Sequence, residues 1–288
     1  MSIKTILLFI CTIFILSVDA QEAIHQTFKD TRVINTPSTE TLGKGKLDFR
    51  VAHRFGDIAG PAGGWTTLYG LETAADVGIG FDYGLSNNFM IGISRTKGSG
   101  DLRQNVHLSS KIKIMEQQDG GNPFNLALYG IGSLSTMPKS EESNRINSFE
   151  KFAHRIYYHL QILLSKKVSD RFSFQIGGGW TYRNLVSTFD QNDLANVSAA
   201  IKYQLSKSFG IIIDANMPFS SLRTTENGYY LPVGIGLEWE TGGGHVFQMN
   251  FTNARGLAET DYLPSTTSNW ADGEYRLGFT IARQFRLR

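Results

Sequence analysis

The sequence predicts an all-β protein: a closed antiparallel transmembrane β-barrel of about twelve strands, with long extracellular loops and short periplasmic turns. Three observations lead to this prediction. Apolar and polar residues alternate with a period of two in a series of segments about ten residues long. The connections between these segments are alternately long and short, and the chain begins with a secretory signal.

The stretch Glu72–Arg95 shows the alternation most clearly. From 73 to 85 the odd-numbered residues are apolar or aromatic apart from Thr73, whereas the even-numbered ones are alanine, aspartate or glycine. After the polar turn Ser86-Asn87-Asn88, the odd-numbered positions from 89 to 93 are again apolar. This pattern predicts a β-hairpin with one apolar face, and each arm is long enough to cross a bilayer at a tilt.

The first 20 residues have the features of a signal peptide. Lys4 supplies a positive charge, residues 6–16 are apolar apart from Cys11 and Thr12, and Val18-Asp19-Ala20 offers a cleavage site. The apolar run is too short for a spanning helix, and no later segment reaches about 18 apolar residues, so helical spans are excluded. Cys11 is the only cysteine, so the mature chain is expected to contain no disulfide.

Residues 21–45 are polar and are expected to form a periplasmic lead-in or a plug that enters the lumen, and residues 46–288 to form the barrel. Strand five is the least regular, because Tyr129 and Ile131 interrupt its polar face. The expected strands are 46–55, 72–85, 89–95, 102–115, 124–135, 152–164, 172–182, 195–205, 209–217, 231–240, 247–251 and 275–286.

The connection lengths indicate which end of the barrel faces outward. The connections after odd-numbered strands include the long ones, at 56–71, 136–150, 183–192, 220–229 and 253–273. Most of those after even-numbered strands are tight turns, as is typical of outer-membrane barrels. A soluble β-sandwich also alternates, but its strands are shorter and its outer face is rich in charge, whereas the apolar face here is almost free of charge.

Several short stretches resemble an uncharacterised family of outer-membrane β-barrel proteins from the Bacteroidetes. Together they cover most of the mature chain. They are Thr31-Arg32-Val33-Ile34-Asn35, Gly45-Lys46-Leu47-Asp48-Phe49-Arg50, His53-Arg54-Phe55-Gly56, Gly80-Phe81-Asp82-Tyr83-Gly84, Thr181-Tyr182-Arg183-Asn184-Leu185-Val186 and 240–248. The resemblance implies a barrel and assigns no activity.

The residues that could carry chemistry do not form a recognisable catalytic, metal or cofactor site. His154 has lipid-facing parity, as a barrel phospholipase would need, but no serine stands two positions away on the same face. The other histidines are scattered without ligand-spaced partners, so no metal is expected. The formal charge of +2 and the dispersed basic residues argue against nucleic-acid binding. The expected partners are outer-membrane lipid and a small polar solute.

The polar face of the strands carries many charges, which we interpret as the lining of the lumen. The pore-lining candidates are Lys46, Asp48, Arg50, Arg54, Glu72, Asp76, Asp82, Arg103, Lys111, Lys113, Arg155, Asp214, Glu238, Arg276 and Arg286. We expect Asp48 to pair with Arg276 or Arg286, and Arg50 with Asp76 or Asp82. Three functions remain open: a narrow channel for small polar or charged solutes, a closed structural or interaction barrel that presents its loops to a partner, and, more remotely, a lipid-modifying enzyme.

Overall fold

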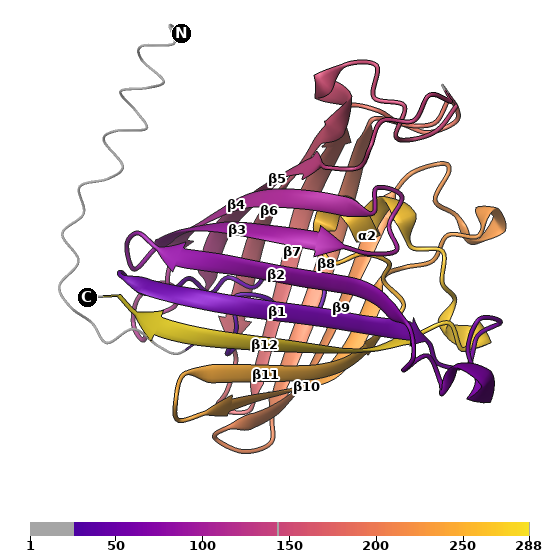
Figure 1. Ribbon diagram of the computed structural model, residues 1–288. Coiled ribbons are helices and arrows are strands. Elements are labelled where there is room, and N and C mark those ends of the chain that lie inside the picture. Colours follow the sequence, from indigo (N-terminus) through magenta and orange to yellow (C-terminus); the bar gives the residue numbers. More distant parts are fainter. Residues whose placement is uncertain (1–25, 143, 288) are drawn as a thin grey trace, which may run out of the picture.

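The computed structural model describes residues 26–142 and 144–287, which form a closed antiparallel barrel of twelve strands (Figure 1). The predicted fold class and strand number are therefore confirmed, and the predicted signal peptide lies outside the described residues. The strands are β1 (Lys46–Asp57), β2 (Ala74–Gly84), β3 (Phe89–Lys97), β4 (Gln104–Met115), β5 (Asn125–Ser135), β6 (Ile156–Lys167), β7 (Phe172–Arg183), β8 (Asp193–Gln204), β9 (Phe209–Phe219), β10 (Val233–Thr241), β11 (His245–Thr252) and β12 (Arg276–Arg286).

The helical elements are short and lie outside the strands. They are the α-helix α2 (Glu259–Ser265) and the 3-10 helices η1 (Trp65–Thr67), η2 (Phe152–Arg155), η3 (Thr225–Asn227) and η4 (Trp270–Asp272). Among the described residues, no helix is long and apolar enough to cross a membrane.

Neighbouring strands pair in chain order, and β1 closes the barrel against β12, with Lys46 opposite Arg286. One end of the barrel carries the short turns, such as 85–88 and 205–208. The other end carries the long connections, of which the one between β11 and β12 includes α2 (Figure 1). This asymmetry agrees with the predicted extracellular loops and periplasmic turns.

The outer face of the barrel is an apolar belt. Alternate residues on neighbouring strands point outward and remain exposed in the isolated chain, including Ile79, Ile93, Leu108, Leu160 and Ile162. A continuous apolar outer face of this kind is unusual for a barrel surrounded by water and is typical of a membrane-bound barrel.

The lumen is filled from both ends. Residues 26–45, the luminal plug, run inside the barrel, and most of their side chains are buried, from Phe28 to Leu42. Residues 253–275, the α2 loop, fold inward from the opposite end, so that Tyr262 and Leu263 are almost fully buried against Leu194 of β8. The two segments together replace the water that a barrel of this size would otherwise contain.

The filled lumen explains where strand five departs from regular alternation. Tyr129 and Ile131 face the lumen, as the sequence indicates, but they pack against Ala258 of the α2 loop and Leu163 of β6. Apolar residues on the polar face therefore mark positions where the lumen is packed rather than wet.

Most strand boundaries differ from those expected by two residues or fewer, and the starts of β6 and β2 have a structural explanation. Strand β6 begins at Ile156 and not at 152, because residues 152–155 form the turn η2. Strand β2 begins at Ala74, because the chain before it makes a left-handed turn through Leu68, Tyr69 and Gly70, with φ of 47°, 55° and 81°. At Gly70 a Cβ atom would lie 2.4 Å from the carbonyl oxygen of Gly56, so this turn requires glycine there.

Candidate functional site

Asp214 of β9 holds the tip of the luminal plug. The plug turns back on itself at this point, where the N–H of Val33 donates to the carbonyl of Thr36 at 2.9 Å. The turn aims the backbone N–H groups of Ile34, Asn35 and Thr36 at Asp214 Oδ2, at 3.3, 2.6 and 2.8 Å. A buried carboxylate that accepts several backbone N–H groups is a strong anchor, because both the charge and the peptide groups would otherwise be unsatisfied.

Cations of the barrel wall hold the rest of the plug. Arg50 of β1 binds Asp30 with both terminal nitrogens and also contacts Asp48 at 3.0 Å. Lys111 of β4 donates to the carbonyl oxygens of Thr31 and Glu40, at 2.7 and 2.9 Å. The lumen-facing charges of β1 and β4 therefore bind the plug.

The plug and the α2 loop meet inside the barrel. Arg32 of the plug forms a salt bridge with Glu259, which is fully buried on α2. Arg54 of β1 joins both segments, because it donates to the carbonyl of Gly256 and to Asn35 Oδ1. A change that moves one segment is therefore transmitted to the other through Arg32 and Arg54.

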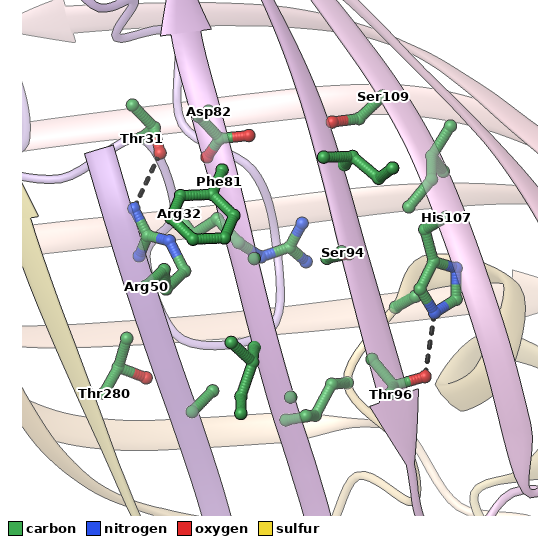
Figure 2. Close-up of a pocket in the computed structure, with 18 of the residues that line it drawn as sticks. Thr31, Arg32, Arg50, Phe81, Asp82, Ser94, Thr96, His107, Ser109 and Thr280 are labelled. Carbon is green, nitrogen blue, oxygen red and sulfur yellow. Dashed lines mark hydrogen bonds between the residues drawn. The ribbon is translucent and has the colours of Figure 1, made fainter. Parts of the chain in front are cut away.

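One side of the lumen remains open as a cavity of about 120 Å³ (Figure 2). It lies between the plug, the lumen-facing side of β1 to β4, and the α2 loop at Leu257 and Ala258. Figure 2 shows Arg32 projecting into it, with Asp82, Ser94 and His107 around it. The wall is thin here because Gly78 and Gly80 of β2 carry no side chain. At about 30 Å³ per molecule, the cavity is large enough for about four water molecules.

The structure places most of the predicted lining residues on the lumen side of the wall. Those that face the lumen from within a strand are Asp48, Arg50, Arg54, Asp76, Asp82, Lys111, Lys113, Asp214, Glu238 and Arg276. Of these, Arg50, Arg54, Asp82 and Lys111 line the cavity. Lys46 and Arg286 have the same parity but lie exposed at the end of the barrel that carries the short turns.

Three of the predicted lining residues lie outside the strands. Glu72 is exposed in the loop before β2, since the left-handed turn described above delays the start of that strand. Arg103 is exposed just before β4. Arg155 belongs to η2 and donates to the carbonyl oxygens of Ser135 and Met137, so it stabilises a loop.

The predicted ion pairs between wall strands are wrong. Asp48 and Arg50 contact each other, and Arg50 pairs with Asp30 rather than with Asp76 or Asp82. Arg276 pairs with Asp57 at 3.1 Å. The reason is that the plug supplies Asp30, a carboxylate that the strand register alone does not reveal.

Sequence reasoning missed the partners that come from the two inserted segments. The polar composition of residues 21–45 suggested a plug but gave no indication that Asp30, Arg32 and Glu40 would bind the wall. Glu259 belongs to a segment that was expected to be an extracellular loop, and nothing in its sequence signals burial.

Two carboxyl groups at the loop end have shifted pKa values. Burial raises the pKa of Asp261 on α2 to about 8, against a weaker opposing hydrogen bond from Ala258. For Asp190, between β7 and β8, burial would raise the pKa, but hydrogen bonds from Arg223 and Arg183 outweigh it and hold the pKa well below its usual range. At neutral pH the ionised carboxylate of Asp190 therefore joins two neighbouring loops through Arg183 and Arg223. Asp261 is largely protonated at the same pH.

Within residues 26–287, position 143 aside, no three histidine, cysteine or acidic side chains gather in a geometry that could hold a metal ion.

Comparisons with known proteins agree with the barrel. The structure resembles an outer-membrane channel from Pseudomonas putida F1, with a TM-score of 0.51, 12% sequence identity, and coverage of 86% of this chain and 98% of that one. The NanC porin gives a TM-score of 0.49 at 10% identity, covering 84% of this chain and 100% of the porin. The KdgM porin gives 0.48 at 8% identity, covering 84% and 99%. At these identities the likeness concerns the fold alone, and among curated proteins none matches the chain.

The family comparison is more specific. The model of a family described as membrane-bound beta barrel domain (DUF5777) matches residues 28–285, which include the plug as well as every strand. Together with the apolar belt and the asymmetric ends, this match agrees with the predicted outer-membrane location. The chain belongs to the membrane-bound beta barrel domain family DUF5777.

Proposed function

We propose that this protein is an outer-membrane channel for small polar solutes, and that the solute path runs along one side of the luminal plug. The observation that carries the proposal is the position of the cavity. It lies between the plug and the lumen-facing side of β1 to β4, where long side chains such as Arg50 and Lys111 reach the plug across the gap. On its other side the plug is hydrogen-bonded to β5, β6, β7 and β9. A path on the β1–β4 side requires no movement of the plug from its anchors.

The side chains beside the cavity suit a polar solute. Arg50, Asp82 and Lys111, three of the predicted lining residues, border it together with His107 and Ser94. Arg50 and Lys111 are held by the plug, whereas Asp82 and Ser94 make no hydrogen bond and can replace part of the hydration of a solute that enters. Replacement of hydration is how a polar constriction selects the solutes that pass. The outer-membrane channel from Pseudomonas putida F1 has a similar fold, which is consistent with a conducting barrel.

The remaining lumen-facing charges act mainly as anchors in this proposal. Asp214 binds the backbone of the plug, and Lys113 binds Glu40 at 3.5 Å. Arg54 and Asp76 contact the backbone of the α2 loop at Gly256. We therefore expect solute selectivity to depend on Asp82 much more than on Asp76, although both are acidic residues of the same strand.

A closed barrel that serves as a structural or interaction module is the second candidate. The observation that favours it is that segments from both ends enter the lumen and contact each other through Arg32 and Glu259. In that case the cavity is a water-filled void, and solutes do not pass while the plug is in place.

A disulfide lock separates the two candidates. Thr39 of the plug and Ser165 of β6 lie with their hydroxyl oxygens 2.6 Å apart, so cysteines at both positions should form a disulfide that fixes the plug. We expect the wild type to conduct in planar bilayers, and the oxidised Thr39→Cys/Ser165→Cys variant to keep that conductance because the path bypasses the plug. The Thr39→Cys single variant controls for the substitution itself.

Two outcomes would contradict the proposal in different ways. Absence of conductance in the wild type would favour the closed barrel. Conductance that disappears on oxidation and returns on reduction would mean that solutes pass only when the plug moves, and the path along its side would be wrong. Deletion of residues 26–40 should enlarge the conductance in either case, because it removes most of the plug from the lumen. An enlarged conductance also shows that the barrel is inserted in the bilayer.

A further inference from the structure

The cations that border the cavity are already used by the inserted segments. Arg32 is paired with Glu259, and Arg50 with Asp30. The ammonium group of Lys111 is held by two carbonyl oxygens of the plug. A negatively charged solute would have to detach one of these groups from its partner, which would leave a buried carboxylate or two carbonyl groups unsatisfied.

Five lumen-facing polar groups of the cavity have no hydrogen-bond partner among the described residues. Within residues 26–142 and 144–287, the side chains of Asp82, Ser94, Ser109, Asn250 and Thr280 make no hydrogen bond, although all five border the cavity. They come from five strands, β2, β3, β4, β11 and β12, and Figure 2 shows four of them around the central space. Elsewhere in the lumen most polar side chains are hydrogen-bonded to the plug or to the α2 loop.

Asn250 is the most informative of the five. Its side chain is 5% exposed, and its Oδ1 atom is buried without a hydrogen-bond partner. Native proteins satisfy nearly all buried amide groups, and an exception is explained when a water molecule or a ligand supplies the partner. Asn250 borders the cavity, where such a partner fits.

The chemistry of the unpartnered groups defines the solute. The three hydroxyl groups and the amide can each donate and accept, whereas the carboxylate of Asp82 accepts only. No unpartnered group is cationic, so a solute with several hydroxyl groups and no negative charge satisfies this set best. At about 30 Å³ per water molecule, the volume of about 120 Å³ corresponds to about four water molecules, which is the size of a three-carbon segment of a polyol.

We propose that the cavity is a binding site for a small uncharged polyhydroxylated solute, held by Asp82, Asn250 and the hydroxyl groups of Ser94, Ser109 and Thr280. The proposal deepens the channel function and rests on it, because the site would lie on the solute path. Asp82 binds hydroxyl groups of the solute with its free carboxylate oxygens, and Asn250 binds further hydroxyl groups from the opposite edge of the cavity.

Equilibrium binding tests the site without requiring conduction. The purified full-length protein in detergent is titrated with glucitol and, in parallel, with gluconate, which has the same carbon skeleton but carries a carboxylate. We expect glucitol to bind and gluconate to bind at least about tenfold more weakly, since it would face Asp82 and the occupied cations. Asn250→Ala and Ser109→Ala should each weaken glucitol binding about fivefold through the loss of hydrogen bonds.

Asn196→Ala is the matched control. Asn196 of β8 is also a lumen-facing asparagine, 3% exposed and with both amide atoms unpartnered, but it does not border the cavity. It should leave glucitol binding unchanged. Three results would each overturn the proposed site. The wild type does not bind glucitol, or it binds gluconate more tightly than glucitol, or Asn196→Ala weakens glucitol binding as much as Asn250→Ala and Ser109→Ala do.

Conductance then separates this inference from the channel function. Glucitol should reduce the ion current of the wild type in planar bilayers, and the reduction should be weaker in Asn250→Ala. Glucitol binding without any ion current would retain the site and refute the channel. An ion current that glucitol leaves unchanged, together with no binding in detergent, would retain the channel and refute the site.

Discussion

At the scale of single residues, Asp214 is the side chain on which the position of the plug depends most. It accepts three backbone N–H groups and the side-chain amide of Asn35, all of them buried. Asp214→Ala leaves these donors unsatisfied. Each donor that water does not reach lowers the stability of the docked plug by about 1–3 kcal/mol. We expect the plug to leave the lumen in a large fraction of molecules, and the single-channel conductance to rise.

The exposed turn residue Asp119 offers a control of the same type, and Asp119→Ala should change nothing. Limited proteolysis provides a second measurement, because Lys29 and Arg32 of the plug become cleavable once it leaves the barrel. An Asp214→Ala variant with wild-type conductance and a protected plug would show that the anchor lies elsewhere.

Asp261 predicts a pH dependence of the α2 loop. Burial raises its pKa to about 8, and the carboxyl groups of Asp76, Asp101 and Glu259 add to the shift. A carboxyl group whose pKa rises on folding binds more protons in the folded than in the unfolded state, so stability is greatest below the unfolded pKa of about 4. The docked loop should lose stability progressively from about pH 4 to about pH 8.

The rate at which a protease cleaves the α2 loop of the folded barrel measures this loss. In the wild type the cleavage rate should increase as the pH rises towards 8. In Asp261→Asn the cleavage rate should be nearly independent of pH, because the asparagine side chain can still accept a hydrogen bond but does not ionise. Asp272→Asn, an exposed change in the same loop, should retain the wild-type slope. The same slope in Asp261→Asn would assign the dependence to another group.

Residue roles were harder to predict from sequence than residue positions. The parity of each strand correctly indicated that Asp76 and Asp82 face the lumen. It could not indicate that Asp76 binds Ser99 and the α2 loop while Asp82 stays free, because that difference depends on segments distant in the sequence. Side-chain direction is a local property, whereas pairing depends on the assembled lumen.

At the scale of elements, the lipid-facing parity gives a direct prediction. Ile213 of β9 lies opposite Ile201 of β8 and Ile235 of β10, so its side chain has only apolar neighbours across the strands. Arginine near the bilayer midplane costs about 2–4 kcal/mol, and Ile213→Arg should lower the free energy of unfolding from lipid vesicles by that amount. Ile213→Val should change it by about 1 kcal/mol, as for a lost methylene.

Ile79→Arg on β2 repeats the test on a distant part of the belt, where Ile79 is also exposed on the outer face. If both arginine variants unfold at the same denaturant concentration as the wild type, the assignment of the two faces is wrong. Folding of the barrel is checked by the shift in its gel migration between unheated and heated samples, since the compact folded barrel migrates faster than the denatured chain.

The strands themselves could be predicted because each one carries its signal locally. Alternation identified all twelve, and most boundaries agree to within about two residues, which is the usual uncertainty of strand ends. The errors arose where a loop has structure of its own, as at η2 before β6, or where a left-handed turn through Leu68–Gly70 delays β2. Turns of that kind depend on contacts between loops, which periodicity does not report.

At the scale of the whole molecule, the main feature that the sequence left undecided is the filled lumen. The plug contacts residues far away in the sequence, for example Asn35 with Thr252, 217 positions apart, and Lys29 with Glu240, 211 positions apart. A polar segment that follows an export signal can equally remain in the periplasm, and only the assembled barrel provides its binding partners. The apolar residues Tyr129, Ile131 and Leu163 on the lumen side were the signal in the sequence that something packs inside.

The orientation of the molecule and the inward fold of the α2 loop can be tested together on intact cells. Phe189, in the loop between β7 and β8, is 89% exposed, and Lys207 lies in a short turn at the opposite end. A membrane-impermeant thiol reagent should label Phe189→Cys rapidly and Lys207→Cys only after the cells are permeabilised. Because the only native cysteine is Cys11 in the expected signal peptide, the background should be low.

Thr266 makes the test specific for this structure. Sequence reasoning places it in a long extracellular loop, where it would be labelled, but in the structure it is 2% exposed, and its hydroxyl donates to the carbonyl of Tyr262 at 2.8 Å. Thr266→Cys should therefore resist labelling on intact cells and react fully after denaturation. Labelling at 207 without labelling at 189 would invert the orientation. Rapid labelling at 266, with the expected pattern at the other two positions, would mean that the α2 loop leaves the lumen in the membrane. The salt bridge between Arg32 and Glu259 would then be broken.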